Sequence, residues 1–231
     1  MDIRILHLTE GARAARGITV VIDVFRAMTV ETYLMQRGAE KIIPVGDTAF
    51  AFKWKERYPD TILCGERGGK MIDGFDFGNS PSQIEHADLT GKTVIHTTSA
   101  GTQGIANAIY ADEIIAGSLV SAKAIAAYIK RKKPDHVSLV CMGLAAVSQT
   151  EEDNLCAEYI KSLLEDKLLA DLQARMDDLK NTSGAKFFDP AQQTVFPERD
   201  FHLCLQADTV PFILRLKKEG DLGVMERVDV L

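Results

Sequence analysis

The sequence predicts an α/β fold in which helices cover both faces of a largely parallel sheet. Short apolar runs rich in β-branched residues, each the length of a strand, recur along most of the chain. Segments with the apolar periodicity of helices separate these runs, as in successive βα units. This alternation is typical of a parallel sheet that is buried on both faces.

The predicted strands cover residues 3–8, 18–24, 41–45, 61–64, 93–98, 113–116 and 136–142. The predicted helices cover residues 28–36, 48–58, 82–87, 101–110, 122–132 and, as one longer stretch, 151–180. The tail beyond residue 180 departs from this order. There we expect a helix end and turn at 181–188, a short helix at 197–206 that begins at a proline, and an edge strand at 223–231.

Composition predicts one domain over residues 1–231, because 46% of the 231 residues are hydrophobic and no Gly-, Pro- or Ser-rich linker divides them. The formal net charge of −6 and the lack of a long basic block disfavour nucleic-acid binding. The four cysteines have no zinc-site or disulfide-framework spacing, which favours a reducing cytoplasm. No apolar run approaches the ~20 residues of a membrane span, so we expect a soluble cytoplasmic protein. Along 151–180, one apolar stripe can pack on the sheet and another on a second subunit, which is compatible with a homodimer.

The segment 64–81, CGERGGKMIDGFDFGNSP, is the predicted active-site loop. Its glycines free the backbone to approach a ligand closely, and its acids, bases and Asn79 supply charge and hydrogen bonds. An ordinary polar surface loop is the alternative. It explains less well why Phe75 and Phe77 alternate with acidic residues.

Three further segments lie where predicted strands end, the edge at which open α/β sheets bind ligands. Asp23 ends the second strand and Arg26 follows three residues later; either Asp23 is a metal ligand or nucleophile, or it caps the next helix and Arg26 neutralises it. The turn TTSAGT at 97–102 can cradle a phosphate with its amides and hydroxyls, or can simply cap a helix. Residues 150–153, TEED, fit a capping box, and their carboxylates could also contribute to a cation site.

Together these segments indicate phosphate-ester chemistry with magnesium. Mg²⁺ prefers oxygen ligands and commonly bridges carboxylates to a substrate phosphate, whereas arginines stabilise phosphoryl oxygens. Zinc is disfavoured because the five histidines are scattered; among them, His96 is more often a satisfied core residue than a general acid. Cys64 is not expected to be a nucleophile, because the following Gly-Glu-Arg is too short for a cysteine-phosphatase loop.

The chain resembles the 2-phosphosulfolactate phosphatase family. The resemblance rests on VVIDVFRAMTV at 20–30, GERGG at 65–69, GFDFGNSP at 74–81, TTSAGT at 97–102 and TEED at 150–153, in this order across most of the chain. It implies a three-layer α/β/α sandwich with a largely parallel or mixed central sheet. It also implies a Mg²⁺-dependent phosphatase that converts 2-phosphosulfolactate to 3-sulfolactate and phosphate, a step of coenzyme M biosynthesis. Ala100, Ser121 and Met28 differ from the family pattern.

The predicted site combines residues from all of these segments. A catalytic role is expected for Asp23, Arg26, Glu66, Arg67 and Asp76, and Mg²⁺ is expected on carboxylates from Asp23, Glu66, Asp76 and Asp153. The predicted substrate-binding residues are Asn79, Ser80, Thr97, Thr98, Ser99, Gly101 and Thr102. Either Asp23 or Glu66 could act as general base or as covalent nucleophile. Two alternatives remain, a phosphatase for another small anionic phosphomonoester and a non-catalytic anion-binding protein.

Overall fold

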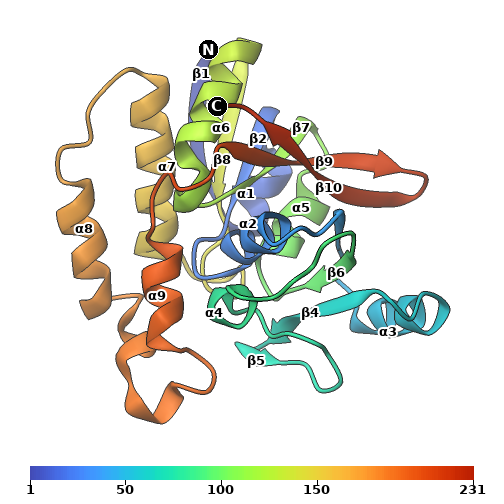
Figure 1. The fold of residues 1–231 in the computed structure, drawn as a ribbon. Helices are drawn as coiled ribbons and strands as arrows, with labels where there is room; N and C mark the ends of the chain where they lie inside the picture. The colour runs from blue at the N-terminus through green and yellow to red at the C-terminus, as the bar shows by residue number, and fades with distance from the viewer.

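A single ten-stranded sheet runs through the protein, and helices lie on both of its faces (Figure 1). The computed structural model describes residues 1–231. Its strands are β1 Asp2–His7, β2 Gly17–Ile22, β3 Lys41–Pro44, β4 Ile62–Arg67, β5 Lys70–Met71, β6 Thr93–Thr97, β7 Ala111–Gly117, β8 His136–Cys141, β9 Phe212–Glu219 and β10 Leu222–Asp229. Its α-helices are α1 Leu8–Ala14, α2 Ala27–Gln36, α3 Thr48–Arg57, α4 Pro81–Ile84, α5 Gly101–Asn107, α6 Ala122–Lys132, α7 Glu151–Leu164, α8 Leu172–Asp178 and α9 Glu198–Cys204.

The strand order is β1-β8-β2-β7-β9-β10-β3-β6-β4-β5. Neighbours are parallel within β1-β8-β2-β7 and within β3-β6-β4, and the antiparallel hairpin β9–β10 joins these two groups. The hairpin meets each group through a single residue pair, Ile115 with Arg215 and Met225 with Ile42. The predicted α/β class, with a mixed and mostly parallel sheet flanked by helices, is confirmed.

Strand β2 shows why both faces of the sheet must be covered. All six of its residues are buried. Ile18, Val20 and Ile22 belong to one core cluster, to which α6 and α7 contribute, whereas Val21 belongs to a second cluster with α2 and part of α5. Since neighbouring residues of a strand point to opposite faces, a strand with no polar face needs a helical layer on each side.

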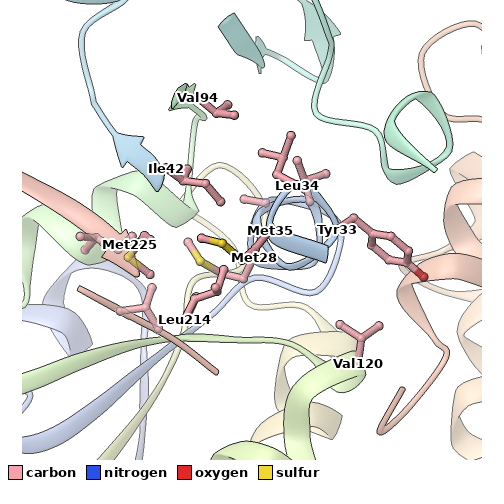
Figure 2. Packing of buried hydrophobic residues seen from close by; sticks show 14 of the residues in the cluster. Met28, Tyr33, Leu34, Met35, Ile42, Val94, Val120, Leu214 and Met225 are labelled. Carbon is pink, nitrogen blue, oxygen red and sulfur yellow. The ribbon is translucent and has the colours of Figure 1, made fainter. Parts of the chain in front are cut away.

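Helix α2 is the central helix of the fold. Nine of its ten residues, Ala27–Met35, are buried, as expected of a helix that other elements surround. Figure 2 shows Met28 of this helix facing Ile42, Met225 and Leu214, which come from the neighbouring strands β3, β10 and β9. Helix α2 therefore packs against the hairpin and the strand beside it in one core cluster.

Several predicted boundaries need correction. The predicted helix 151–180 is two helices, because α7 ends at Leu164 and Asp166 adopts a φ of 56°. The N–H of Lys167 then donates to the carbonyl of Ser162 at 2.8 Å, the hydrogen bond of a Schellman motif. The strand predicted at 223–231 corresponds to β10, but its predicted place at the edge of the sheet is wrong. Strand β10 lies inside the sheet between β9 and β3, and β9 was not predicted.

The helices predicted at 82–87 and 101–110 are shorter in the structure, as α4 and α5. The short helix expected at 197–206 is α9, which follows Pro197. Helix α1 had not been predicted. No helix combines the length and the apolar character that a membrane span requires.

Candidate active site

A cavity of about 190 Å³ lies at the carboxyl ends of β2, β4, β6 and β8, the edge where the sequence predicted the chemistry. Most lining residues follow these strand ends, and two, Lys186 and Phe196, come from the segment between α8 and α9. The lining residues are Asp23, Phe25, Arg26, Glu66, Gly68, Gly69, Asn79, Ser99, Ala100, Gly143, Leu144, Ala145, Lys186 and Phe196. Of the predicted site residues, Asp23, Arg26, Glu66, Asn79 and Ser99 thus lie together.

Asp23 directly follows β2 and is buried. Its Oδ1 accepts a hydrogen bond from the N–H of Ala27 at 3.1 Å, so the residue does support the start of α2. Its Oδ2 accepts no hydrogen bond from the protein. Burial, with a smaller contribution from the negative charge of Glu66, raises the pKa of Asp23 to about 6, although the hydrogen bond from Ala27 opposes the shift. One oxygen is therefore structural and the other is free for chemistry.

Glu66 lines the cavity and connects two loops. Its Oε1 accepts from the N–H of Ser99 at 2.6 Å, and its Oε2 accepts from the N–H of Gly69 at 2.7 Å and from the Ser99 hydroxyl at 3.2 Å. These bonds hold the carboxylate in one orientation at the cavity wall. They also direct the Ser99 amide, which was expected to cradle phosphate, toward Glu66.

Arg26 lines the cavity but does not pair with Asp23. Its Nη1 donates to Asp200 at 2.8 Å and to the carbonyl of Val195 at 2.9 Å, and its Nη2 donates to the carbonyl of Gly69 at 3.1 Å. The reading in which Arg26 neutralises Asp23 is therefore wrong. Its observed contacts join the start of α2 to the C-terminal segment.

Arg67 and Asp76 lie outside the cavity, so their position gives no support to the predicted catalytic roles. Arg67 is exposed and donates to the Thr97 hydroxyl at 2.8 Å. It points away from the cavity because successive residues of β4 point to opposite sides and Glu66 lies on the cavity side. Asp76 accepts from the N–H of Leu63 at 2.8 Å and from Lys55 at 2.7 Å. It thereby fastens its loop to β4.

Most of the predicted substrate-binding residues have structural partners instead. Thr98 and Thr102 bond to each other, and the Ser80 hydroxyl donates to Asp200 at 2.9 Å. Gly101 packs so closely under Asp23 that a Cβ there would lie 3.1 Å from Oδ2. Thr97, Thr98, Ser80, Gly101 and Thr102 do not line the cavity, and of the hydroxyl-rich turn only Ser99 and Ala100 do.

Asp153 lies below the cavity and was expected to bind metal. Its Oδ1 accepts from the N–H of Val24 at 2.8 Å and its Oδ2 from the N–H of Gly143 at 2.7 Å. Burial, followed by the charges of Glu152 and Asp23, raises its pKa well above the usual range. The capping-box interpretation is also wrong, since Thr150 makes no side-chain cap bond. Asp153 instead fixes the two backbone segments on either side of the cavity.

The residues fit a magnesium ion held by few protein ligands. Nowhere do three His, Cys, Asp or Glu side chains converge as a metal cage, so the set Asp23, Glu66 and Asp153 does not meet at one point. Mg²⁺, however, is usually held by one or two carboxylates, waters and substrate phosphate. The free Oδ2 of Asp23, with Glu66 on the same wall, satisfies that smaller requirement.

The sequence analysis missed Lys186 and Phe196. Lys186 makes no ion pair, and burial lowers its pKa although the charge of Glu152 opposes the shift. Its ammonium lies 5.3 Å from the centre of the Phe196 ring. The only available signal was a lysine between small and aromatic residues in GAKFF, a pattern that packing alone also explains.

Known proteins match this chain over most of its length. A family model described as 2-phosphosulpholactate phosphatase matches residues 4–219. A probable 2-phosphosulfolactate phosphatase of Bacillus subtilis (strain 168) is 31% identical over 228 residues, 99% of this chain and 99% of the relative. Another from Carboxydothermus hydrogenoformans is 41% identical over 166 residues, 71% of this chain and 68% of the relative. The chain therefore belongs to the 2-phosphosulpholactate phosphatase family, which confirms both the resemblance and the predicted enzyme class, a phosphoric monoester hydrolase.

Proposed function

We propose that the chain hydrolyses 2-phosphosulfolactate to 3-sulfolactate and phosphate in a Mg²⁺-dependent reaction of the type used in coenzyme M biosynthesis. The names of the relatives support this substrate. The observation that carries the proposal is the free Oδ2 of Asp23, a buried carboxyl oxygen in a cavity that also contains the unpaired cation Lys186. A carboxyl group and a cation in one desolvated cavity suit the transfer of an anionic phosphoryl group.

Asp23 and Glu66 are the residues that would hold Mg²⁺, because they are the carboxylates that line the cavity. When bound, the ion would supply positive charge for the phosphoryl oxygens. Asp153 would contribute indirectly, since its hydrogen bond to Val24 fixes the backbone next to Asp23.

The protein's own side chains would bind and orient the ester. Lys186 donates to a phosphoryl oxygen, and Phe25 and Phe196 limit the access of water on the apolar side of the cavity. Asp23 Oδ2 would act by one of two routes. In the first it accepts the proton of a water that attacks phosphorus while the P–O bond to the substrate alcohol breaks. In the second it attacks phosphorus itself and displaces the alcohol, and water then hydrolyses the aspartyl phosphate to release phosphate. Trapping of a phosphorylated Asp23 would identify the second route.

Phosphate release from 2-phosphosulfolactate and from a panel of small phosphomonoesters, with Mg²⁺ or with EDTA, tests the proposal. We expect release from phosphosulfolactate that EDTA abolishes, and a loss of at least about a hundredfold in Asp23→Asn. Asp73→Asn is the matched control, because Asp73 is exposed and does not line the cavity. Full activity in Asp23→Asn, or release that EDTA leaves unchanged, would contradict the mechanism.

A different small phosphomonoester is the second candidate substrate, and Ala100 favours it. Of the three positions that differ from the family pattern, only Ala100 lines the cavity. Met28 lies in the core and Ser121 is buried beside Ser118. Alanine offers no side-chain donor to a sulfonate or carboxylate of the substrate. If phosphate is released from another ester alone, in a Mg²⁺-dependent reaction, the proposed mechanism is kept and the substrate changes.

A further inference from the structure

A chain of three polar side chains leads from the core to the cavity wall. Glu31 of α2 and His96 of β6 are both fully buried, and their Oε1 and Nδ1 atoms lie 2.9 Å apart. On the other side of the ring, Nε2 of His96 lies 3.3 Å from Oδ1 of Asn79. Asn79 precedes α4, is 6% exposed and lines the cavity.

The charge balance of the buried pair determines where the protons are. If a protonated Glu31 donates a hydrogen bond from Oε1 to Nδ1, the neutral ring carries its own hydrogen on Nε2. If Glu31 is ionised and the ring is an imidazolium, Nε2 again carries a hydrogen. Two arrangements would leave Nε2 bare. An ionised Glu31 beside a neutral ring buries an uncompensated charge, which costs several kcal/mol. A neutral Glu31 that accepts from Nδ1–H with Oε1 would carry its hydroxyl on Oε2, where the buried donor has no partner, and this costs about 1–3 kcal/mol. The second oxygen of Glu31, Oε2, is buried without a hydrogen-bond partner, which makes an isolated negative charge there still less favourable.

The hydrogen on Nε2 fixes the orientation of Asn79. An N–H at this position requires an acceptor, so the amide must turn its Oδ1 toward His96. Its NH₂ group then lies on the other side, has no acceptor within the protein, and belongs to a residue that lines the cavity. With the opposite amide orientation, two hydrogen-bond donors would face each other.

We propose that Glu31 and His96 are positioning residues which hold the Asn79 amide so that its NH₂ group donates to an anionic oxygen of the bound phosphate ester. This inference rests on the proposed phosphatase function. It assigns His96 a role beyond that of a satisfied core residue, since a well-packed apolar pair is often at least as stable as a buried ionisable pair.

A double-mutant cycle with inorganic phosphate as the ligand tests the assignment. One arm is Asn79→Ala. The other is the joint replacement Glu31→Leu with His96→Phe, which removes both polar partners together and leaves no buried charge unpaired. We expect each arm to weaken phosphate binding about tenfold to a hundredfold, as for a lost hydrogen bond to a charged group. The combined variant should lose little more than Asn79→Ala alone, because the pair acts through Asn79.

Fully additive losses, or unchanged phosphate binding in the Glu31→Leu/His96→Phe variant, would overturn the inference. A purely structural role would lower the melting temperature without this coupling. A second measurement needs no variant and no ligand: the ¹⁵N spectrum of histidine-labelled wild-type protein should show a proton on Nε2 of His96. A bare Nε2 would overturn the inference even if phosphate esters are hydrolysed. If Nε2 is protonated but the protein neither hydrolyses esters nor binds phosphate, the result contradicts the proposed function. It then also contradicts the assignment of a phosphate ester as the ligand of Asn79.

Discussion

Arg26 at the start of α2 forms a buried ion pair with Asp200 of α9, at 2.8 Å between Nη1 and Oδ2, across 174 positions of sequence. The side chains are 3% and 0% exposed. Asp200 also accepts hydrogen bonds from the Ser80 hydroxyl and from the N–H of Ser82, both at 2.9 Å. The pair therefore ties the C-terminal wall of the cavity to the loop that carries Asn79 and to the strand end that carries Asp23.

Replacement of Asp200 by alanine should destabilise the protein strongly. It leaves the Arg26 guanidinium buried without its counter-ion, and breaking one partner of such a pair typically costs about 3–5 kcal/mol. Urea unfolding of Asp200→Ala against wild type measures this free energy. Activity should fall as well, because Phe196 and Lys186 lie on the wall that the pair holds.

The exposed ion pair of Arg4 with Asp2, also 2.8 Å long, provides the control. Its side chains are 67% and 47% exposed, so water already solvates both charges and Asp2→Ala should change stability little. Equal effects of the two alanine variants would show that burial does not set the strength of the Arg26–Asp200 pair.

The ion pair also illustrates what the sequence could predict. The end of β2 was predictable, because an apolar run followed by Asp23 marks a strand that ends at a polar site. The partner of Arg26 was not, because local periodicity contains no information about a contact with α9. The same reason explains the missed Lys186, which reaches the cavity only through the packing of the C-terminal segment.

Sheet order shows the same limit. Strand β9 begins with apolar residues but continues as Arg-Leu-Lys-Lys-Glu, a pattern that resembles a surface segment. Its partner β10 is paired along its whole length with β9, through a turn in which Gly220 has a φ of 61°. The place of this hairpin between two parallel groups depends on the packing of Leu214 and Met225 against α2, which no single segment specifies.

Asp23→Asn should inactivate the enzyme and yet stabilise the fold above pH 6. Burial holds the pKa of Asp23 at about 6 in the folded protein, above its value of 3.8 in model compounds. The folded state therefore binds the proton more tightly than the unfolded state, and wild-type stability falls as the pH rises from about 4 to about 6. The variant lacks this loss, so at pH 8 without metal it should be more stable by about 2–3 kcal/mol.

Urea unfolding of both proteins at pH 4 and pH 8, with EDTA present, measures that difference. It should be small at pH 4, where Asp23 is protonated in the folded protein, and large at pH 8. A difference that does not grow with pH would show that Asp23 keeps its charge at little cost.

Gly65→Ala should disrupt the site through the backbone. Gly65 has a φ of 154°, and a Cβ there would run into the carbonyl oxygen of Thr97. Because β4 and β6 pair at these residues, the clash would separate Glu66 from Ser99. Gly91→Ala is the matched control: its φ of 70° also disfavours alanine, by about 1 kcal/mol, but nothing lies within 4 Å of the added carbon. The melting temperature and the rate of phosphate release should both fall far more in Gly65→Ala than in Gly91→Ala. Similar values for the two variants would show that the added carbon causes no strain at the β4–β6 junction.

Lys186 should determine how phosphate binding responds to alkaline pH. Burial lowers its pKa below that of a free lysine, so the ammonium loses its proton, and its attraction for phosphate, as the pH rises toward that lowered value. Competitive inhibition by inorganic phosphate, measured from pH 7 to pH 10, should therefore weaken in wild type. Lys186→Met should bind phosphate about tenfold or more weakly and show a flatter profile, because the titrating charge is gone.

Lys186→Arg keeps a charge throughout this range and should retain binding to higher pH. Exposed Lys180, changed to methionine, is the control and should leave the profile unchanged. If Lys186→Met reproduces the wild-type profile, the cation that binds phosphate is not Lys186.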